Sequence, residues 1–138
     1  MFRKKSVYRT DPMPKKQFRR IINSFERHGG KVLRNKEAEE RLARLGVEAS
    51  TINDKTVIFS RHPSRAAVFE EFIHVTQYKL GENDGSYFST LKCEIEAKEK
   101  LLKNKKQYKL TEQEIKDTYE SLKRYQKDLN DYLRGGKS

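Results

Sequence analysis

The sequence contains a single cysteine, Cys93, among its 138 residues. One cysteine cannot form an internal disulfide, and a zinc site built on several thiolates is equally excluded. No apolar run approaches the ~18 residues that a membrane-spanning helix requires. The N-terminal segment is basic but lacks the apolar stretch of a signal peptide. We therefore expect no membrane span and no export by the signal-peptide route.

Apolar residues are scarce as well, at 34% of the chain against 37% for charged residues. The core must therefore be modest. Seven Phe and seven Tyr nevertheless supply large side chains to fill it, so the composition differs from that of a disordered chain. The length fits a single domain.

The net positive charge is concentrated at the two ends of the chain. Residues 1–20 and 98–138 have net charges of +7 and +5, which leaves −1 for residues 21–97 out of a total of +11. Basic segments can bind nucleic acid through its phosphates. Candidate contacts are Arg3, Lys4, Lys5, Arg19, Arg20 and the lysines after Lys98. We favour a solvated, Lys-rich surface and a basic leader, because the charge lies at the two ends and the centre is neutral.

Breaker residues and apolar spacing divide the chain into its expected elements. Residues 1–14 contain Asp11, Pro12 and Pro14 and show no periodicity, so we expect a basic leader or linker there and a single domain over 15–138.

Capping residues and helical spacing then predict about five helices. Asn35 and Ser64 are expected N-caps, Gly46 is an expected helix end, and Thr111–Glu114 is a capping box. The predicted helices cover residues 15–28, 36–45, 65–80, 87–106 and 112–134, and the predicted short strands cover residues 31–34 and 56–59. We expect an α+β fold that is mostly α, with a small sheet of two or three strands.

The predicted helix over residues 65–80 is mostly apolar but carries Glu70, Glu71, His74 and Gln77. Glu70, His74 and Gln77 stand at i, i+4 and i+7, so they share one face, and Glu71 borders it. Carboxylates are costly to bury without partners. This polar stripe is therefore either exposed to solvent or used for a function.

The spacing within the stripe indicates a metal site. In the zincin motif H-E-x-x-H, two ligands at i and i+4 hold zinc and the intervening Glu acts as general base. In Glu70-Glu71-x-x-His74, Glu70 and His74 take the ligand positions and Glu71 takes the position of the base. A carboxylate ligand favours harder metals, so the expected cofactor is Zn²⁺ or another divalent metal.

A third ligand is expected from the following helix, with Glu96 as our first choice and Glu94 as our second. The alternative is that Glu70, Glu71, His74 and the two later carboxylates have only a structural role. The helix would then expose an acidic edge, His74 would pair with Glu71 or Glu70, and the two later carboxylates would face solvent.

The segment Ala67–Gln77, with its sequence A-V-F-E-E-F-I-H-V-T-Q, resembles the E-E-x-x-H-x-x-Q helix of zincin-like metallopeptidase domains from the C-termini of bacterial polymorphic toxins. The resemblance continues in Gly29–Arg34, Leu45–Ser50 and Glu94–Lys98, and it spans roughly residues 17–130.

The resemblance implies a zincin-like toxin effector domain with metallopeptidase-like activity on a protein or peptide substrate. It further implies secretion or delivery by a larger effector, action in the cytoplasm of a target cell, and a cognate immunity protein as partner. Strict zincins have His at the position of Glu70, whereas related toxin-type domains share the acidic version.

Two other functions stay open from the sequence. One is a nucleic-acid-binding or nuclease toxin that uses the basic ends. The other is a non-catalytic interaction module, in which the stripe from Glu70 to Gln77 is a binding surface or an internal polar network.

Overall fold

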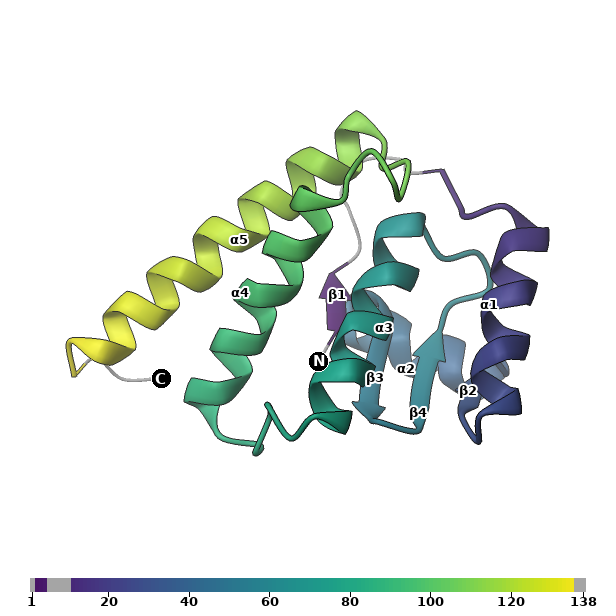
Figure 1. The fold of residues 1–138 in the computed structure, drawn as a ribbon, viewed down its shortest axis with the longest axis horizontal. Coiled ribbons are helices and arrows are strands. Elements are labelled where there is room, and N and C mark those ends of the chain that lie inside the picture. The colour runs from purple at the N-terminus through teal and green to yellow at the C-terminus, as the bar shows by residue number, and fades with distance from the viewer. Residues whose placement is uncertain (1, 5–10, 136–138) are drawn as a thin grey trace.

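The computed structural model describes residues 2–4 and 11–135 and has an α+β fold that is mostly helical, as expected (Figure 1). Helices and strands alternate through the first half of the chain, and three helices form the second half. The strands are β1 (Phe2–Lys4), β2 (Lys31–Leu33), β3 (Val47–Asn53) and β4 (Thr56–Phe59). The helices are α1 (Lys15–Arg27), α2 (Lys36–Leu45), α3 (Arg65–Lys79), α4 (Tyr87–Lys103) and α5 (Glu112–Leu133).

The sheet has four strands in the order β1-β3-β4-β2. The two expected strands do pair, since β2 runs parallel to β4 with Val32 opposite Val57. Strand β3 was not expected, and it pairs antiparallel with both β4 and β1. The sheet is therefore larger than the expected two or three strands.

The alternation of side chains along β4 separates two apolar clusters. Val57 and Phe59 point to one side, where they pack with α1 and α3, whereas Ile58 points to the other side and packs against Leu42 of α2. Successive side chains of a strand point to opposite faces of the sheet, and both faces of β4 are covered by apolar side chains. The sheet is thus enclosed between α2 on one face and α1 with α3 on the other (Figure 1).

Helix α2 begins and ends where the sequence predicts. The side chain of Asn35 accepts a hydrogen bond from the backbone N–H of Ala38 at 2.9 Å, and Gly46 ends the helix with a φ of 68°, a conformation that glycine adopts at little cost. Leu45, the last residue of α2, is 53% exposed.

The expectation of a leader over residues 1–14 is wrong for the parts that the structure describes. Strand β1 pairs with β3, and the side chain of Arg3 is buried. Met13 is buried in the larger apolar cluster, and its N–H donates to the carbonyl of Pro63 at 2.8 Å. The rest of the expected leader, residues 5–10, lies outside the described residues.

Helix α3 lies between the sheet and α4, and α4 forms an antiparallel hairpin with α5 (Figure 1). The capping box at the start of α5 is present, with Thr111 and Glu114 each bonding the backbone of the other. On α5, Leu122 is buried but Tyr119 is 52% exposed. Among the described residues, no helix has both the length and the apolar composition of a membrane span.

Candidate metal centre

The polar stripe of α3 is buried, because the helix is packed on both sides. The sheet covers one side of α3 and α4 covers the other. Glu70, Glu71 and His74 are 0% exposed and Gln77 is 1% exposed. The alternative of a solvent-exposed acidic edge is therefore wrong. Burial removes the carboxylates from water, so their charges need partners inside the protein.

Glu70, His74 and Glu94 converge between α3 and α4. Each offers one ligand atom, and these three atoms lie within 4.8 Å of one another. The closest approach joins His74 Nε2 to Glu94 Oε1 at 2.8 Å.

The structure reverses our order of preference for the third ligand. Glu94 is 3% exposed and belongs to the cluster. The side chain of Glu96 is 44% exposed and pairs with Lys100 at 3.3 Å. Helical periodicity contains the signal that distinguishes them, because Glu94 shares a buried face with Leu91 and Leu101 at i−3 and i+7.

Gln77 determines the tautomer of His74. The Gln77 Nε2 group donates to the carbonyl of Cys93 at 2.9 Å and to Glu96 at 3.2 Å. The amide oxygen therefore faces His74 Nδ1, which lies 2.7 Å away. Nδ1 must then carry a proton, so in the neutral imidazole the lone pair is on Nε2 and points into the cluster. Metal-ligating histidines are oriented by a hydrogen bond of this kind.

Two buried cations compensate the carboxylates, and the sequence analysis missed both roles. Lys98 Nζ lies 3.2 Å from Glu70 Oε2 and also 3.2 Å from Glu94 Oε1. Arg3 Nη1 donates to the other oxygen of Glu70 at 3.1 Å. Lys98 is 1% exposed and Arg3 is 7% exposed. Lys98 lies four residues after Glu94 on the same buried face, so its position in the sequence could have indicated this pairing.

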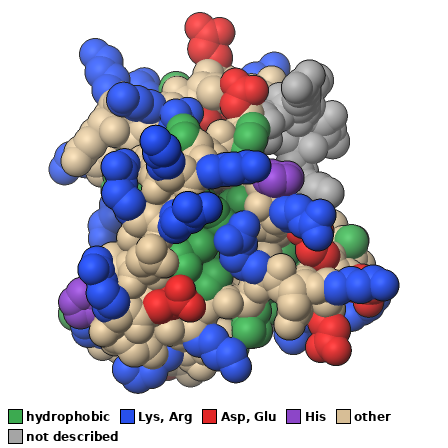
Figure 2. All heavy atoms as spheres, turned by 90° about the vertical axis from the view of Figure 1, so that its right-hand side faces the viewer, with side chains coloured by type: hydrophobic (Ala, Val, Ile, Leu, Met, Phe, Trp, Pro, Cys, Tyr) green, Lys and Arg blue, Asp and Glu red, His purple; other side chains and the backbone are tan. Residues whose placement is uncertain are grey.

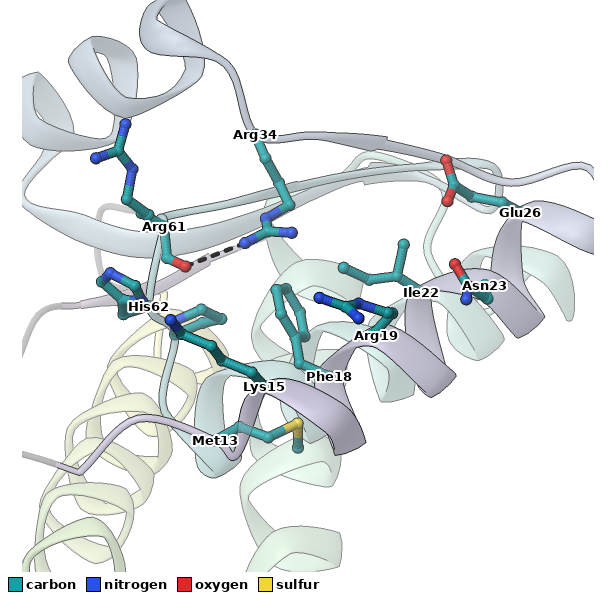
Figure 3. A pocket seen from close by; sticks show the side chains of 11 residues that line it. Met13, Lys15, Phe18, Arg19, Ile22, Asn23, Glu26, Arg34, Arg61 and His62 are labelled. Atoms are coloured by element: carbon teal, nitrogen blue, oxygen red, sulfur yellow. Dashed lines mark hydrogen bonds between the residues drawn. The ribbon is translucent and has the colours of Figure 1, made fainter.

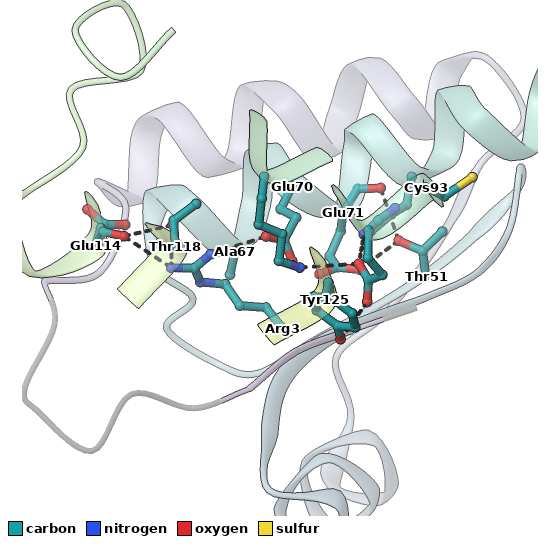
Figure 4. Close-up of polar contacts among 12 residues, drawn as sticks. Arg3, Thr51, Ala67, Glu70, Glu71, Cys93, Glu114, Thr118 and Tyr125 are labelled. Carbon is teal, nitrogen blue, oxygen red and sulfur yellow. Dashed lines mark hydrogen bonds and ion pairs between the residues drawn. The ribbon is translucent and has the colours of Figure 1, made fainter. Parts of the chain in front are cut away.

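Hydrogen bonds extend the cluster into α5 (Figure 4). The hydroxyl of Tyr125 donates to Glu94 Oε2 at 3.0 Å. Arg3 Nη2 donates to Thr118 Oγ1 at 3.0 Å and to the carbonyl of Glu114 at 3.4 Å. One polar network therefore joins β1, α3, α4 and α5.

Glu71 occupies a different environment from that of the two paired carboxylates. Thr51 donates to its Oε1 at 2.9 Å, while its Oε2 has no hydrogen-bond partner among the residues described. The pKa of Glu71 is raised to about 8: burial is the main cause, the charge of His74 opposes it, and the charges of Glu70 and Glu94 add to it. Glu71 is therefore a carboxyl group that holds its proton near neutral pH.

Glu94 and His74 form a coupled pair. Burial tends to raise the pKa of Glu94, but Lys98 and His74 outweigh it and lower this pKa to about 2. Burial tends to lower the pKa of His74, but the hydrogen-bonding and charge effects of Glu94 outweigh it and raise that pKa. The pair thus favours a negative Glu94 beside a positive His74.

The donor set suits a divalent metal. One imidazole nitrogen and two carboxylate oxygens are ligands that Zn²⁺ and harder divalent metals accept, and the His74 nitrogen is already oriented. The ammonium of Lys98 lies on the same two carboxylates. The site therefore attracts a positive charge, and a metal would have to displace Lys98.

The expected nucleic-acid contacts separate into two groups. Arg3 is buried in the polar network and cannot reach a phosphate, whereas Arg19 and Arg20 are exposed on α1. The side chain of Lys4 and all of Lys5 lie outside the described residues.

Comparison with known proteins identifies no relative of this chain: no family model, curated protein or solved structure matches it.

The raised pKa of Glu71 predicts a pH dependence of stability. The folded state holds this proton up to about pH 8, while an unfolded Glu loses it near its ordinary pKa of 4.5. The free energy of unfolding should therefore fall as pH rises from about 4.5 to about 8. Glu71→Gln should flatten that decline and be the more stable form at the alkaline end, measured by urea unfolding across this range.

Glu40→Gln is the matched control, because Glu40 is exposed on α2. It should reproduce the slope of the wild-type protein. A Glu71→Gln protein with the same slope as Glu40→Gln would contradict the assignment of the buried proton to Glu71.

Proposed function

We propose that this domain is a metal-dependent hydrolase whose divalent metal is held by Glu70, His74 and Glu94. One observation carries the proposal. Three ligand atoms from two helices lie within 4.8 Å of one another in a buried place, and Gln77 holds the imidazole with Nε2 towards them. Catalytic zinc sites commonly use three such ligands and keep one position open. The helix motif and the third ligand from the next helix are consistent with a zincin-like arrangement.

A bound divalent metal would act as a Lewis acid and lower the pKa of a water molecule towards neutrality. Glu71 is the base of this proposal, since its charge interacts with those of all three ligands. The positive charge of a bound metal would lower its pKa from about 8 and free the carboxylate to accept a proton from water. Thr51 holds one of its oxygens and leaves the other to exchange a proton. Tyr125 orients Glu94 through its second oxygen.

Lys98 controls access of a metal in this proposal. Its ammonium contacts Glu70 and Glu94, so metal affinity depends on the cost of moving it away. The cluster is also shielded from solvent, and a substrate reaches it only when a covering element moves. Strand β1 is the shortest such element, with three residues, and Arg3 connects it to Glu70.

The biological role that we propose is that of a toxin effector. A protein or peptide substrate, delivery by a larger effector into a target-cell cytoplasm and neutralisation by an immunity protein are all supported by the sequence resemblance of Ala67–Gln77 and its flanking segments.

Complete burial and the position of Lys98 favour a second candidate, a non-catalytic module with an internal ion network. In that case Lys98 is the permanent cation of the cluster, and the pairs with Glu70 and Glu94 specify how α3 meets α4. The two candidates differ in what happens when Lys98 is removed.

Lys98→Met tests the first candidate against the second. Loss of the ammonium leaves two buried carboxylates short of a cation, which should destabilise the protein by on the order of 3–5 kcal/mol when chelator is present. Zn²⁺ or Mn²⁺ should restore the thermal stability and bind more tightly than to the wild-type chain. Thermal unfolding and calorimetric titration measure both effects.

Lys100→Met is the control on the same helix, because Lys100 pairs with Glu96 at the surface. It should change neither stability nor metal affinity appreciably. If neither the Lys98→Met protein nor the wild-type chain binds metal, the hydrolase proposal is contradicted and the second candidate is favoured. If Lys98→Met does not fold, Glu94→Gln should still weaken metal binding to the otherwise intact chain.

Glu71→Gln tests the catalytic part of the proposal. The wild-type chain should arrest growth when it is expressed in the cytoplasm of bacterial host cells, and Glu71→Gln should abolish this effect, because an amide cannot accept the proton. Circular dichroism should show that the variant is folded, and Glu40→Gln should remain toxic. If a folded Glu71→Gln protein were as toxic as the wild-type chain, this result would contradict the role of Glu71 as base.

A further inference from the structure

A hollow lies on the α1 side of the molecule, away from the α4–α5 hairpin (Figures 1 and 2). It is formed by one side of α1, the segment after β2 and the turn between β4 and α3, and its volume is about 430 Å³. This size lies within the range of small-molecule sites. None of the residues that line it belongs to the Glu70–His74–Glu94 cluster.

The floor of the hollow is apolar. Met13, Phe18 and Ile22 line it and are each no more than 8% exposed. Figure 2 shows apolar side chains at the bottom of this depression with Lys and Arg side chains around it. The floor can therefore pack against an apolar or aromatic group, while the rim remains strongly positive.

Four cations stand on the rim: Lys15, Arg19, Arg34 and Arg61. Within the described part of the chain, none of them forms an ion pair with a carboxylate. Figure 3 shows the guanidinium groups of Arg19 and Arg34 turned towards the Phe18 ring from opposite walls. One carboxylate, that of Glu26, also lines the hollow, so the four cations leave a net positive charge that attracts an anion.

Arg34 is held in place before any ligand arrives. Its guanidinium carbon lies 4.5 Å from the centroid of the Phe18 ring, and its Nη2 donates to the carbonyl of Arg61 at 3.1 Å. The remaining donors of the planar group are free to bind a phosphate in a forked geometry. A side chain that is already ordered loses little entropy on binding.

The hollow continues into a second one around the start of α2. The two share Arg34, Arg61 and His62, and the second adds Lys36 and Glu39, whose carboxylate accepts the N–H of Arg61. The positive surface is therefore longer than one small ligand, and a chain of phosphates could follow it from α1 to α2.

We propose that this hollow is a nucleotide-binding site. The phosphate lies between Arg19 and Arg34, and the base packs on the apolar floor formed by Phe18 and Ile22. The nucleotide is either free or one residue of a single strand that extends past Arg61 towards Lys36. The negative charge of a phosphate is concentrated on one group, which matches guanidinium groups that converge on one place. The carboxylates of an acidic peptide are spread along its chain and match this arrangement less well.

The test uses the full chain and four probes: AMP, inorganic phosphate, a fluorescently labelled eight-residue single-stranded oligouridylate and an Asp-rich peptide. AMP should bind more tightly than phosphate, because only AMP uses the floor. Arg34→Gln and Arg19→Gln should each weaken AMP binding about tenfold, the loss expected for one charge-assisted contact. Arg41→Gln is the control, because Arg41 is exposed on α2 outside both hollows.

The arms of the experiment separate the outcomes. Similar affinities for AMP and the oligonucleotide identify a free nucleotide as ligand, whereas much tighter oligonucleotide binding with a steep salt dependence identifies a single strand. Equal binding of phosphate and AMP, binding of the acidic peptide alone, or unchanged affinity in both Arg variants would each overturn the proposal. The two variants are at exposed positions, so loss of folding does not confuse the result.

Discussion

The carboxylates of Glu70 and Glu94 have lost contact with solvent, and their need for positive charge shapes the centre of this molecule. Lys98 lies between them, and Arg3 reaches the far oxygen of Glu70 from β1. Glu94 also receives the hydroxyl of Tyr125. These ion pairs and hydrogen bonds connect the N-terminal strand, the central helix and the α4–α5 hairpin. Apolar packing assembles the rest of the fold around the sheet, in two clusters that β4 separates.

The same arrangement gives the cluster its chemical character. A place that binds an ammonium through two carboxylates also offers those carboxylates to a divalent metal, and His74 adds an oriented nitrogen 2.8 Å from Glu94. A metal at this place would therefore compete with Lys98 for one position. Glu71 forms no ion pair with a Lys or Arg among the described residues, so burial dominates and its pKa rises to about 8. Two neighbouring residues of one helix turn thus have different surroundings, because Arg3 and Lys98 lie opposite Glu70 and Thr51 lies opposite Glu71.

Local signals in the sequence predicted the helices well, because caps such as Asn35, Ser64 and Thr111 act within a few residues. The helix with Glu70, Glu71 and His74 was also predicted correctly as the place where polar residues gather. Strand β1 was missed because three residues carry no periodicity and depend on β3 for their hydrogen bonds. Arg3 was missed as a partner because only the folded chain brings it to Glu70, whereas the spacing of Lys98 and Glu94 was an available signal that was overlooked. The sequence analysis preferred Glu96 as third ligand, but Glu94 lies in the cluster, because the rotation of α4 against α3 decides which carboxylate is buried.

A crystal structure of the wild-type chain grown with Zn²⁺, with anomalous data at the zinc edge, tests the central claim most directly. The account predicts a zinc peak about 2.0–2.2 Å from Glu70, His74 Nε2 and Glu94, with the ammonium of Lys98 moved away from both carboxylates. A structure with no zinc in this cluster and Lys98 still between Glu70 and Glu94 would contradict it.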